Sequence, residues 1–204
     1  MKKIVKLSIA VLAVVIAMAF KPIINPELGI GSAIPKPDYK MMDVNGKEIS
    51  LVGVKGENGL LVIFSCNTCP YVKLSETRIK EVAAFAKRNK IGVIVVNSNE
   101  AQRDADDSFE EMKKYAKSQA YDFSYVVDKN SQLADAFGAT RTPHTFLFDK
   151  KGLAYRGAID DNIKDANEAK EHFLKDAIMA VGEGKPVKVN STKSVGCSIK
   201  RVEE

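Results

Sequence analysis

The sequence contains no tryptophan, only three cysteines and only two histidines among its 204 residues. Three cysteines are too few for a small secreted scaffold that depends on many disulfides. Proline and glycine, at 7 and 13 residues, are too scarce for a collagen-like or linker-like chain. Because 45% of the residues are hydrophobic, the chain can fill a core, and a disordered protein is excluded.

A dense basic cluster is also missing from the sequence. The formal charge is +5, but the first 19 residues hold three lysines and no acidic residue, so the rest of the chain carries only +2. No basic patch that could bind a phosphate backbone stands out in that remainder. We therefore expect no nucleic-acid partner.

The N-terminus has the pattern of a targeting segment. Positive Met1-Lys2-Lys3 precedes an almost unbroken apolar run from Leu7 to Phe20, and Ala17-Met18-Ala19 supplies the small residues of a cleavage site. This pattern predicts a signal peptide at residues 1–19. The alternative is an uncleaved membrane anchor, although a spanning helix needs about 20 apolar residues. Both interpretations predict an exported protein, periplasmic or otherwise extracytoplasmic, that is soluble or tethered by this segment.

Three further segments follow this leader. Residues 20–37 carry four of the seven prolines and two glycines, which predicts an irregular arm. Residues 38–185 have the length and apolar content of one domain. Residues 186–204 are expected to form an irregular C-terminal tail.

Strand-like and helix-like patterns alternate within residues 38–185. Asn45-Gly46 is the strongest turn signal and predicts a β-hairpin from Tyr39 to Leu51. The other predicted strands are residues 60–64, 91–96, 123–127, 144–148 and 153–159, and the predicted helices run from Pro70 to about residue 89 and over residues 107–118, 131–137 and 165–181. This order predicts an α/β sandwich with a mixed central sheet and an N-terminal hairpin.

The segment Cys66-Asn67-Thr68-Cys69 is the candidate chemical centre. It follows a predicted buried strand and opens a predicted helix, which is the context of a redox dithiol. Unpaired backbone N–H groups and the dipole at a helix N-terminus stabilise an anion, so a thiolate is favoured there. The thiolate is the nucleophile of thiol–disulfide exchange.

Three other interpretations of this pair stay open. A zinc site needs about four ligands, and only His144, His172 and Cys197 could complete one, so we expect no metal and no organic cofactor. The pair could form an inert structural disulfide in a redox-inert binding domain, because disulfides persist outside the cytoplasm. It could also be two unrelated buried cysteines.

Thr142-Pro143 is the second feature of interest. Pro143 immediately precedes a predicted strand, where a missing N–H group is tolerated and one backbone face stays free for a substrate chain. Only about 5–6% of X–Pro bonds in folded proteins are cis, so the dipeptide alone does not establish a cis bond.

These residues together resemble a thioredoxin-fold protein of the redoxin branch, which includes extracytoplasmic thioredoxin-like reductases and the alkyl hydroperoxide reductase/thiol-specific antioxidant peroxiredoxins. The resemblance rests on Cys66-Asn67-Thr68-Cys69-Pro70, on Thr142-Pro143 before a hairpin, on Tyr155-Arg156-Gly157 and on Gly196-Cys197-Ser198-Ile199-Lys200. It implies a thioredoxin-like three-layer fold over about residues 38–200.

The resemblance also implies roles for individual residues. Cys66 would be the attacking thiol, more exposed at the helix start, and Cys69 would resolve the mixed disulfide. Pro143 would be cis and face the pair, and Thr142 would offer backbone hydrogen bonds to a substrate strand. The partners would be a protein or small molecule that carries a disulfide and a thiol electron donor or acceptor.

The sequence departs from the family pattern at several positions. Leu60 and Val72 stand where some relatives carry acidic proton relays. Peroxiredoxins have a threonine three residues before a Cys-Pro, and here Cys66 replaces it. A thiol peroxidase with Cys69 as the peroxidatic thiol is therefore the alternative function, and Arg141 and Arg156 are its candidate peroxide-binding residues.

Other polar residues receive less specific predictions. Cys197 is either a third redox thiol or a small buried residue of the tail. His144 either tunes the thiolate or faces solvent on its strand. Asp160 and Asp161 are either a paired acid site or, as we expect, turn and cap residues. We expect Arg78 to lie on a solvated helix face and Asp107 to belong to a helix start.

Overall fold

The structure is a computed structural model that describes residues 26–202. The predicted signal peptide or anchor at residues 1–19 and the first part of the predicted arm lie outside the described residues. Within residues 26–202, no helix combines the length and the apolar character needed to cross a membrane.

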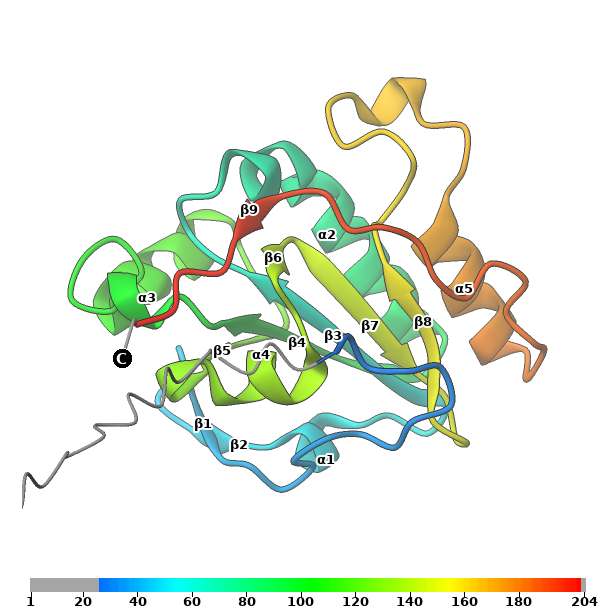
Figure 1. Ribbon diagram of the computed structural model, residues 1–204, viewed down its shortest axis with the longest axis horizontal. Helices are drawn as coiled ribbons and strands as arrows, with labels where there is room; N and C mark the ends of the chain where they lie inside the picture. The colour runs from blue at the N-terminus through cyan, green and yellow to red at the C-terminus, as the bar shows by residue number, and fades with distance from the viewer. Residues whose placement is uncertain (1–25, 203–204) are drawn as a thin grey trace, which may run out of the picture.

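One mixed sheet of seven strands organises the described chain (Figure 1). The strand order is β2-β1-β5-β4-β3-β7-β8, in which β3, β4 and β5 are mutually parallel and the adjacent β1 and β7 run antiparallel to them. The strands are β1 (Met41–Asp43), β2 (Glu48–Ile49), β3 (Gly59–Ser65), β4 (Ile91–Asn97), β5 (Ser124–Val127), β7 (His144–Phe148) and β8 (Leu153–Gly157). The predicted mixed α/β sandwich is confirmed.

The predicted N-terminal hairpin is present as β1 and β2. Met41 pairs with Ile49, and Gly46 at the turn has a φ of +78°, a conformation that favours glycine. The second strand is shorter than expected, because Ser50 caps a one-turn helix, α1 (Leu51–Val54), through a hydrogen bond from the Gly53 N–H group.

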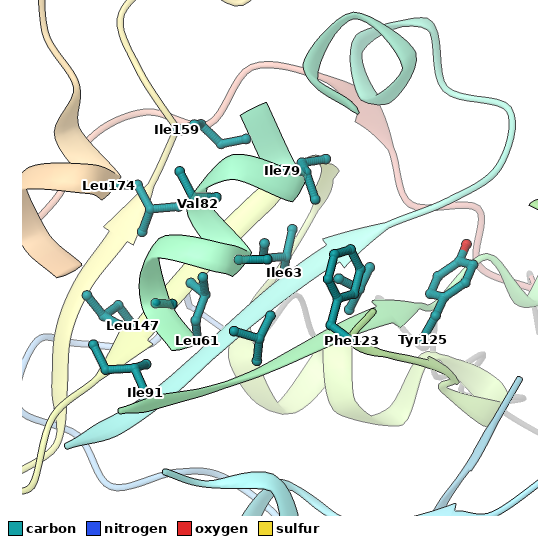
Figure 2. Close-up of a cluster of buried hydrophobic side chains, with 14 of the residues drawn as sticks. Leu61, Ile63, Ile79, Val82, Ile91, Phe123, Tyr125, Leu147, Ile159 and Leu174 are labelled. Atoms are coloured by element: carbon teal, nitrogen blue, oxygen red, sulfur yellow. The ribbon is translucent and has the colours of Figure 1, made fainter. Parts of the chain in front are cut away.

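Helices cover both faces of the sheet. The helices are α2 (Pro70–Arg88), α3 (Phe109–Ser118), α4 (Gln132–Phe137) and α5 (Phe173–Gly182), with short 3-10 turns at η1 (Glu100–Gln102), η2 (Lys129–Ser131) and η3 (Ala166–Glu168). Figure 2 shows Leu61 and Ile63 of β3 among side chains of α2 and α5. On the opposite face, Phe64 packs against Phe137 of α4. Both faces of β3 are therefore buried, as its continuous apolar sequence indicates.

The last helix is shorter than the sequence predicted. It was expected over residues 165–181, but α5 begins at Phe173. The preceding segment forms a loop in which the Asp161 carboxylate accepts hydrogen bonds from the N–H groups of Lys170 and Glu171. Asp165 caps only the 3-10 turn η3. Carboxylates that bond nearby backbone groups compete with helix formation, which explains the difference.

The chain on either side of the predicted domain also packs on the sheet. In the arm, the Leu28 N–H group donates to Phe137 and the Gly31 N–H group donates to Leu153. The predicted irregular tail needs one correction, because Cys197–Ser198 forms the strand β9. This strand pairs antiparallel with β6 (Arg141–Thr142), and both are labelled in the upper half of Figure 1.

Candidate active site

The two cysteines of the motif lie where β3 ends and α2 begins. Cys66 follows the last residue of the strand, and Cys69 is the N-cap of the helix, with Pro70 at its first position. Proline is favoured there because the first helical N–H group has no intrahelical partner. Cys69 is the N-cap residue of α2, and the Val72 N–H group in the first turn interacts with its sulfur.

Both sulfur-bearing side chains are buried. Cys66 and Cys69 are each only 2% exposed, so the expectation that Cys66 is the more exposed thiol is wrong. The reason is that Cys66 comes directly after the buried strand β3 and does not lie on the first turn of α2. All three cysteines of the chain are free thiols in this structure.

Thr142 and Pro143 lie against the cysteine pair. The peptide bond between them is cis. Cys66 Sγ is 3.5 Å from the Thr142 hydroxyl, and Cys69 Sγ is 3.2 Å from the Thr142 carbonyl oxygen. Residues separated by more than 70 positions in sequence are therefore in direct contact at one site.

Cys197 brings a third sulfur to the site. In strand β9 it is the register partner of Thr142, and its Sγ lies 2.7 Å from Cys69 Sγ. The Cys66 and Cys69 thiols both contact Thr142 and interact with each other. The three sulfurs thus form a chain of contacts with Cys69 in the middle.

The environment separates the pKa values of these three thiols. Hydrogen bonds from the Cys66 and Cys197 thiols, and from the N–H groups of Val72 and Cys197, lower the pKa of Cys69 to about 4 against the effect of burial. The hydrogen bond to Cys69, burial and the nearby Asp107 carboxylate raise the pKa of Cys66. Burial and the proximity of Cys69 raise the pKa of Cys197 to about 11. The arrangement therefore favours one thiolate, on Cys69.

Asp107 is a site residue that the sequence analysis missed. It does not cap α3, because Ser108 does so, and it is fully buried. Its carboxylate accepts hydrogen bonds from the Asn67 N–H group at 2.8 Å, from Asn97 Nδ2 at 2.8 Å and from Asn99 Nδ2 at 2.8 Å. Asp107 therefore fixes the loop between the two cysteines. Nothing in its local sequence distinguishes it from a helix-start aspartate.

His144 is not a solvent-facing strand residue, because it is only 1% exposed. Its Nε2 lies 2.8 Å from the Glu27 carboxylate, which the N-terminal arm brings over β7. Arg156 also reaches Glu27 and donates to backbone carbonyls of the arm. Arg141 is exposed and donates to the Gly196 carbonyl. Of the two candidate peroxide-binding arginines, Arg156 thus binds the N-terminal arm and Arg141 binds the C-terminal tail.

Arg78 and Asp160 also differ from expectation. Arg78 was expected on a solvated face of α2 and Asp160 in a turn, but both are 7% exposed and form an ion pair at 2.7 Å. Arg78 also donates to the carbonyl oxygens of Asn162 and Ile163. This pair joins α2 to the loop after β8, an association between distant segments that the sequence pattern does not encode.

A cavity of about 350 Å³ opens beside the site. Its lining includes Pro143, Ser75 of α2, Phe173 of α5 and Val195 of the tail. Among residues 26–202, no three His, Cys, Asp or Glu side chains are grouped as metal ligands would be.

Comparison with known proteins places these features in a family. The family model described as Redoxin matches residues 30–171. The thiol-disulfide oxidoreductase ResA of Geobacillus thermodenitrificans is 25% identical over 125 residues, covering 61% of this chain and 66% of that protein. The chain thus aligns with just under two thirds of the length of this curated relative.

Two solved structures are more similar over a larger part of the chain. The hypothetical protein SMc02350 from Sinorhizobium meliloti 1021 has a TM-score of 0.79 and 29% identity, covering 88% of this chain and 98% of that chain. An uncharacterized conserved protein from Geobacillus kaustophilus has a TM-score of 0.76 and 30% identity, covering 84% of this chain and 93% of that chain. More distant thioredoxin-like structures share the fold alone. The fold is thioredoxin-like, and the chain belongs to the redoxin family.

Proposed function

We propose that this protein is an exported thiol–disulfide oxidoreductase whose redox pair is Cys66 and Cys69. The observation that carries the proposal is the Cys69 sulfur at the start of α2, with a pKa lowered to about 4 and with the Cys66 thiol as a hydrogen-bond partner. A stabilised thiolate beside a second thiol is the arrangement that thiol–disulfide exchange requires.

The proposed reaction moves two electrons and two protons without a cofactor. A thiolate of the pair attacks one sulfur of a partner disulfide, and the partner's other sulfur leaves as a thiolate and takes up a proton. The second cysteine then attacks the mixed disulfide, so that a Cys66–Cys69 disulfide forms and the partner dithiol is released. A thiol donor restores the pair by the reverse steps. The order of attack stays a prediction. Cys66 is predicted to attack first, but the thiol whose pKa is lowered is Cys69.

Thr142 and Pro143 are the proposed substrate-binding residues. The Thr142 carbonyl and hydroxyl groups lie within 3.5 Å of the two sulfurs, so a chain that took the place of β9 on this segment would bring its own sulfur to the pair. The partners would be a disulfide-bearing protein or small molecule and a thiol electron donor or acceptor. The basic and apolar leader supports export of the chain, with cleavage or anchoring by the same segment.

The reduction potential of the pair tests this proposal against a redox-inert domain. A working couple has a potential between about −120 and −270 mV, whereas a structural disulfide lies below about −300 mV. We expect a value in the working range, and loss of insulin disulfide reduction in Cys66→Ser and in Cys69→Ser. A potential below the working range, or insulin reduction that survives Cys66→Ser, would contradict the dithiol mechanism.

A second function, thiol peroxidase, is favoured by the same lowered pKa at Cys69 and by the Pro70 that follows it. The Cys69 thiolate would attack a peroxide oxygen, release water or an alcohol and become a sulfenic acid, which Cys66 would resolve as a disulfide with loss of water. Peroxide consumption should then be lost in Cys69→Ser. Full consumption by that variant would exclude Cys69 as the peroxidatic thiol.

A further inference from the structure

The redox pair is covered by the chain's own tail. Cys66 and Cys69 are buried, whereas Cys197 is partly exposed, so Cys197 is the most accessible of the three thiols. Strand β9 occupies the hydrogen-bonding edge of Thr142, where a substrate strand would have to pair. An external chain therefore meets Cys197 before it meets either member of the pair.

The tail is fixed on both sides of Cys197. After it, the Ile199 N–H group donates to Thr140, and Lys200 is bonded both to Asn99 and to Ala101. Ile199 itself is buried in the core. Because these hydrogen bonds hold the segment after Cys197, it is a fixed part of the site.

The stretch before Cys197 is held as well. The Thr192 N–H group donates to Arg156, and the Thr192 hydroxyl contacts the Tyr155 hydroxyl at 2.8 Å. At Gly196 the backbone passes so close to the Thr142 carbonyl oxygen that an added Cβ would lie 2.0 Å from it. Glycine is therefore required here for β9 to approach β6.

We propose that Cys197 is a relay thiol, through which the buried Cys66–Cys69 pair exchanges electrons with an external protein dithiol or disulfide. This inference rests on the proposed oxidoreductase function. Its basis is the gathering of the three sulfurs at Thr142, where Cys66 and Cys69 both contact this residue and Cys197 Sγ lies 2.7 Å from Cys69 Sγ.

The electrons and protons of the relay balance without any further reactant. The Cys197 thiolate attacks Cys69 Sγ of the Cys66–Cys69 disulfide, the Cys69–Cys197 bond forms, and Cys66 leaves and takes up the proton that Cys197 lost. A thiolate of a partner dithiol then attacks Cys197 Sγ, and Cys69 leaves as a thiolate. The partner's second thiol attacks the mixed disulfide and releases Cys197. Two electrons have passed from the partner dithiol, now a disulfide, to the pair.

The pKa values of Cys69 and Cys197 agree with the partner's attack on Cys197 Sγ. A thiol of low pKa is the better leaving group in exchange. When a partner attacks the Cys69–Cys197 disulfide, the stabilised sulfur of Cys69 therefore leaves, and Cys197 carries the mixed disulfide at the surface. The raised pKa of Cys197 disfavours its departure in this step, and it leaves only in the last step, when the partner's second thiol attacks within the mixed disulfide.

Two measurements test the relay. Full-length Cys66→Ser, treated with diamide, should form a Cys69–Cys197 disulfide that peptide mapping detects. The oxidised wild-type protein, Cys197→Ser and Cys197→Ala should then be mixed with reduced thioredoxin, a folded protein dithiol, and the free thiols counted by mass-tagging over time. We expect reduction of both Cys197 variants to be slower by on the order of tenfold. Ser198→Ala, an exposed neighbour on the same strand, should match the wild type.

The outcomes separate the relay from the proposed function. If both Cys197 variants are reduced at the wild-type rate, or if no Cys69–Cys197 disulfide forms, the relay is wrong. A working-range potential measured for the Cys66–Cys69 pair in Cys197→Ser would show that the oxidoreductase function survives that result. A pair that is inert in the wild type as well would overturn the function itself.

Discussion

The backbone N–H group of Asn67, between the two cysteines of the site, donates a hydrogen bond to the Asp107 carboxylate at 2.8 Å. Asn67 is further held by its side chain, whose Nδ2 donates to the Asp106 carbonyl and whose Oδ1 accepts from the Tyr125 hydroxyl. The loop that carries the redox pair is thus tied to the start of α3 and to β5. Its geometry depends on residues far from the cysteines in sequence.

Asp107→Ala should destabilise the protein. It removes a buried, charged acceptor and leaves the N–H donors of Asn67, Asn97 and Asn99 without their partner. Hydrogen bonds to charged groups contribute about 1.5–3 kcal/mol each and three are lost, so we expect the free energy of unfolding to fall by about 4 kcal/mol or more. Urea denaturation measures it. Asp104→Ala, at an exposed position nearby, should have little effect, and equal effects would contradict this role.

Arg78→Met should also be costly. Removing one partner of a buried ion pair leaves the Asp160 carboxylate uncompensated, which costs about 3–5 kcal/mol. The double variant with Asp160→Leu should recover part of this loss, because the unpaired charge is then gone. Thermal and urea unfolding of the single and double variants provide the test, with exposed Lys73→Met as the control on the same helix. A single variant as stable as the wild type would show that the pair is dispensable.

Glu76 should make stability depend on pH. Burial raises its pKa above the ordinary value of 4.5, although the Tyr115 and Tyr121 hydroxyls donate to its carboxylate. The folded state therefore holds the proton more tightly than the unfolded state. Its stabilising contribution is complete below pH 4.5 and is lost as the pH rises through the raised value.

The Glu76→Gln variant isolates this effect. The free energy of unfolding of the variant, relative to the wild type, should increase as the pH rises from 4 toward neutrality. Chemical denaturation at a series of pH values measures it. Glu81→Gln, exposed on the same helix, should show no such trend. A difference between Glu76→Gln and the wild type that does not change with pH would contradict the assignment.

Gly196→Ala should loosen the tail. The added methyl group would collide with the Thr142 carbonyl oxygen and push β9 away from β6. We expect faster alkylation of Cys66 and Cys69 by a bulky maleimide, by on the order of tenfold, since both are buried beneath this region. Val195→Ala, at an exposed neighbouring position, is the control. Unchanged protection of the pair in Gly196→Ala would mean that the tail does not shield it.

The sequence predicted the elements whose signals are local. The continuous apolar run at residues 60–64 became β3, Asn45-Gly46 became the hairpin turn, and Gly138 ended α4 in the left-handed conformation. Strand and helix periodicity with strong turn residues is sufficient for such features. The position of the cysteine pair between β3 and α2 followed from the same signals.

The sequence could not predict the contacts that depend on the tertiary fold. The Cys69–Cys197 contact joins residues 128 positions apart, and the Arg78–Asp160 pair joins residues 82 positions apart. An aspartate, an arginine or a histidine has the same local pattern whether it is solvated or buried with a partner. For that reason the burial of Asp107, Arg78 and His144 was missed.

The central claim of this account is that the reduced site holds a thiolate on Cys69, and the pH titration of thiolate ultraviolet absorbance tests it most directly. The reduced wild-type protein should show a transition near pH 4, as should Cys197→Ala at a somewhat higher pH because the side-chain donor of Cys197 is lost, while Cys69→Ser should lack this acidic transition. A wild-type titration whose only thiol transitions lie at or above pH 9, the ordinary value, would contradict the account.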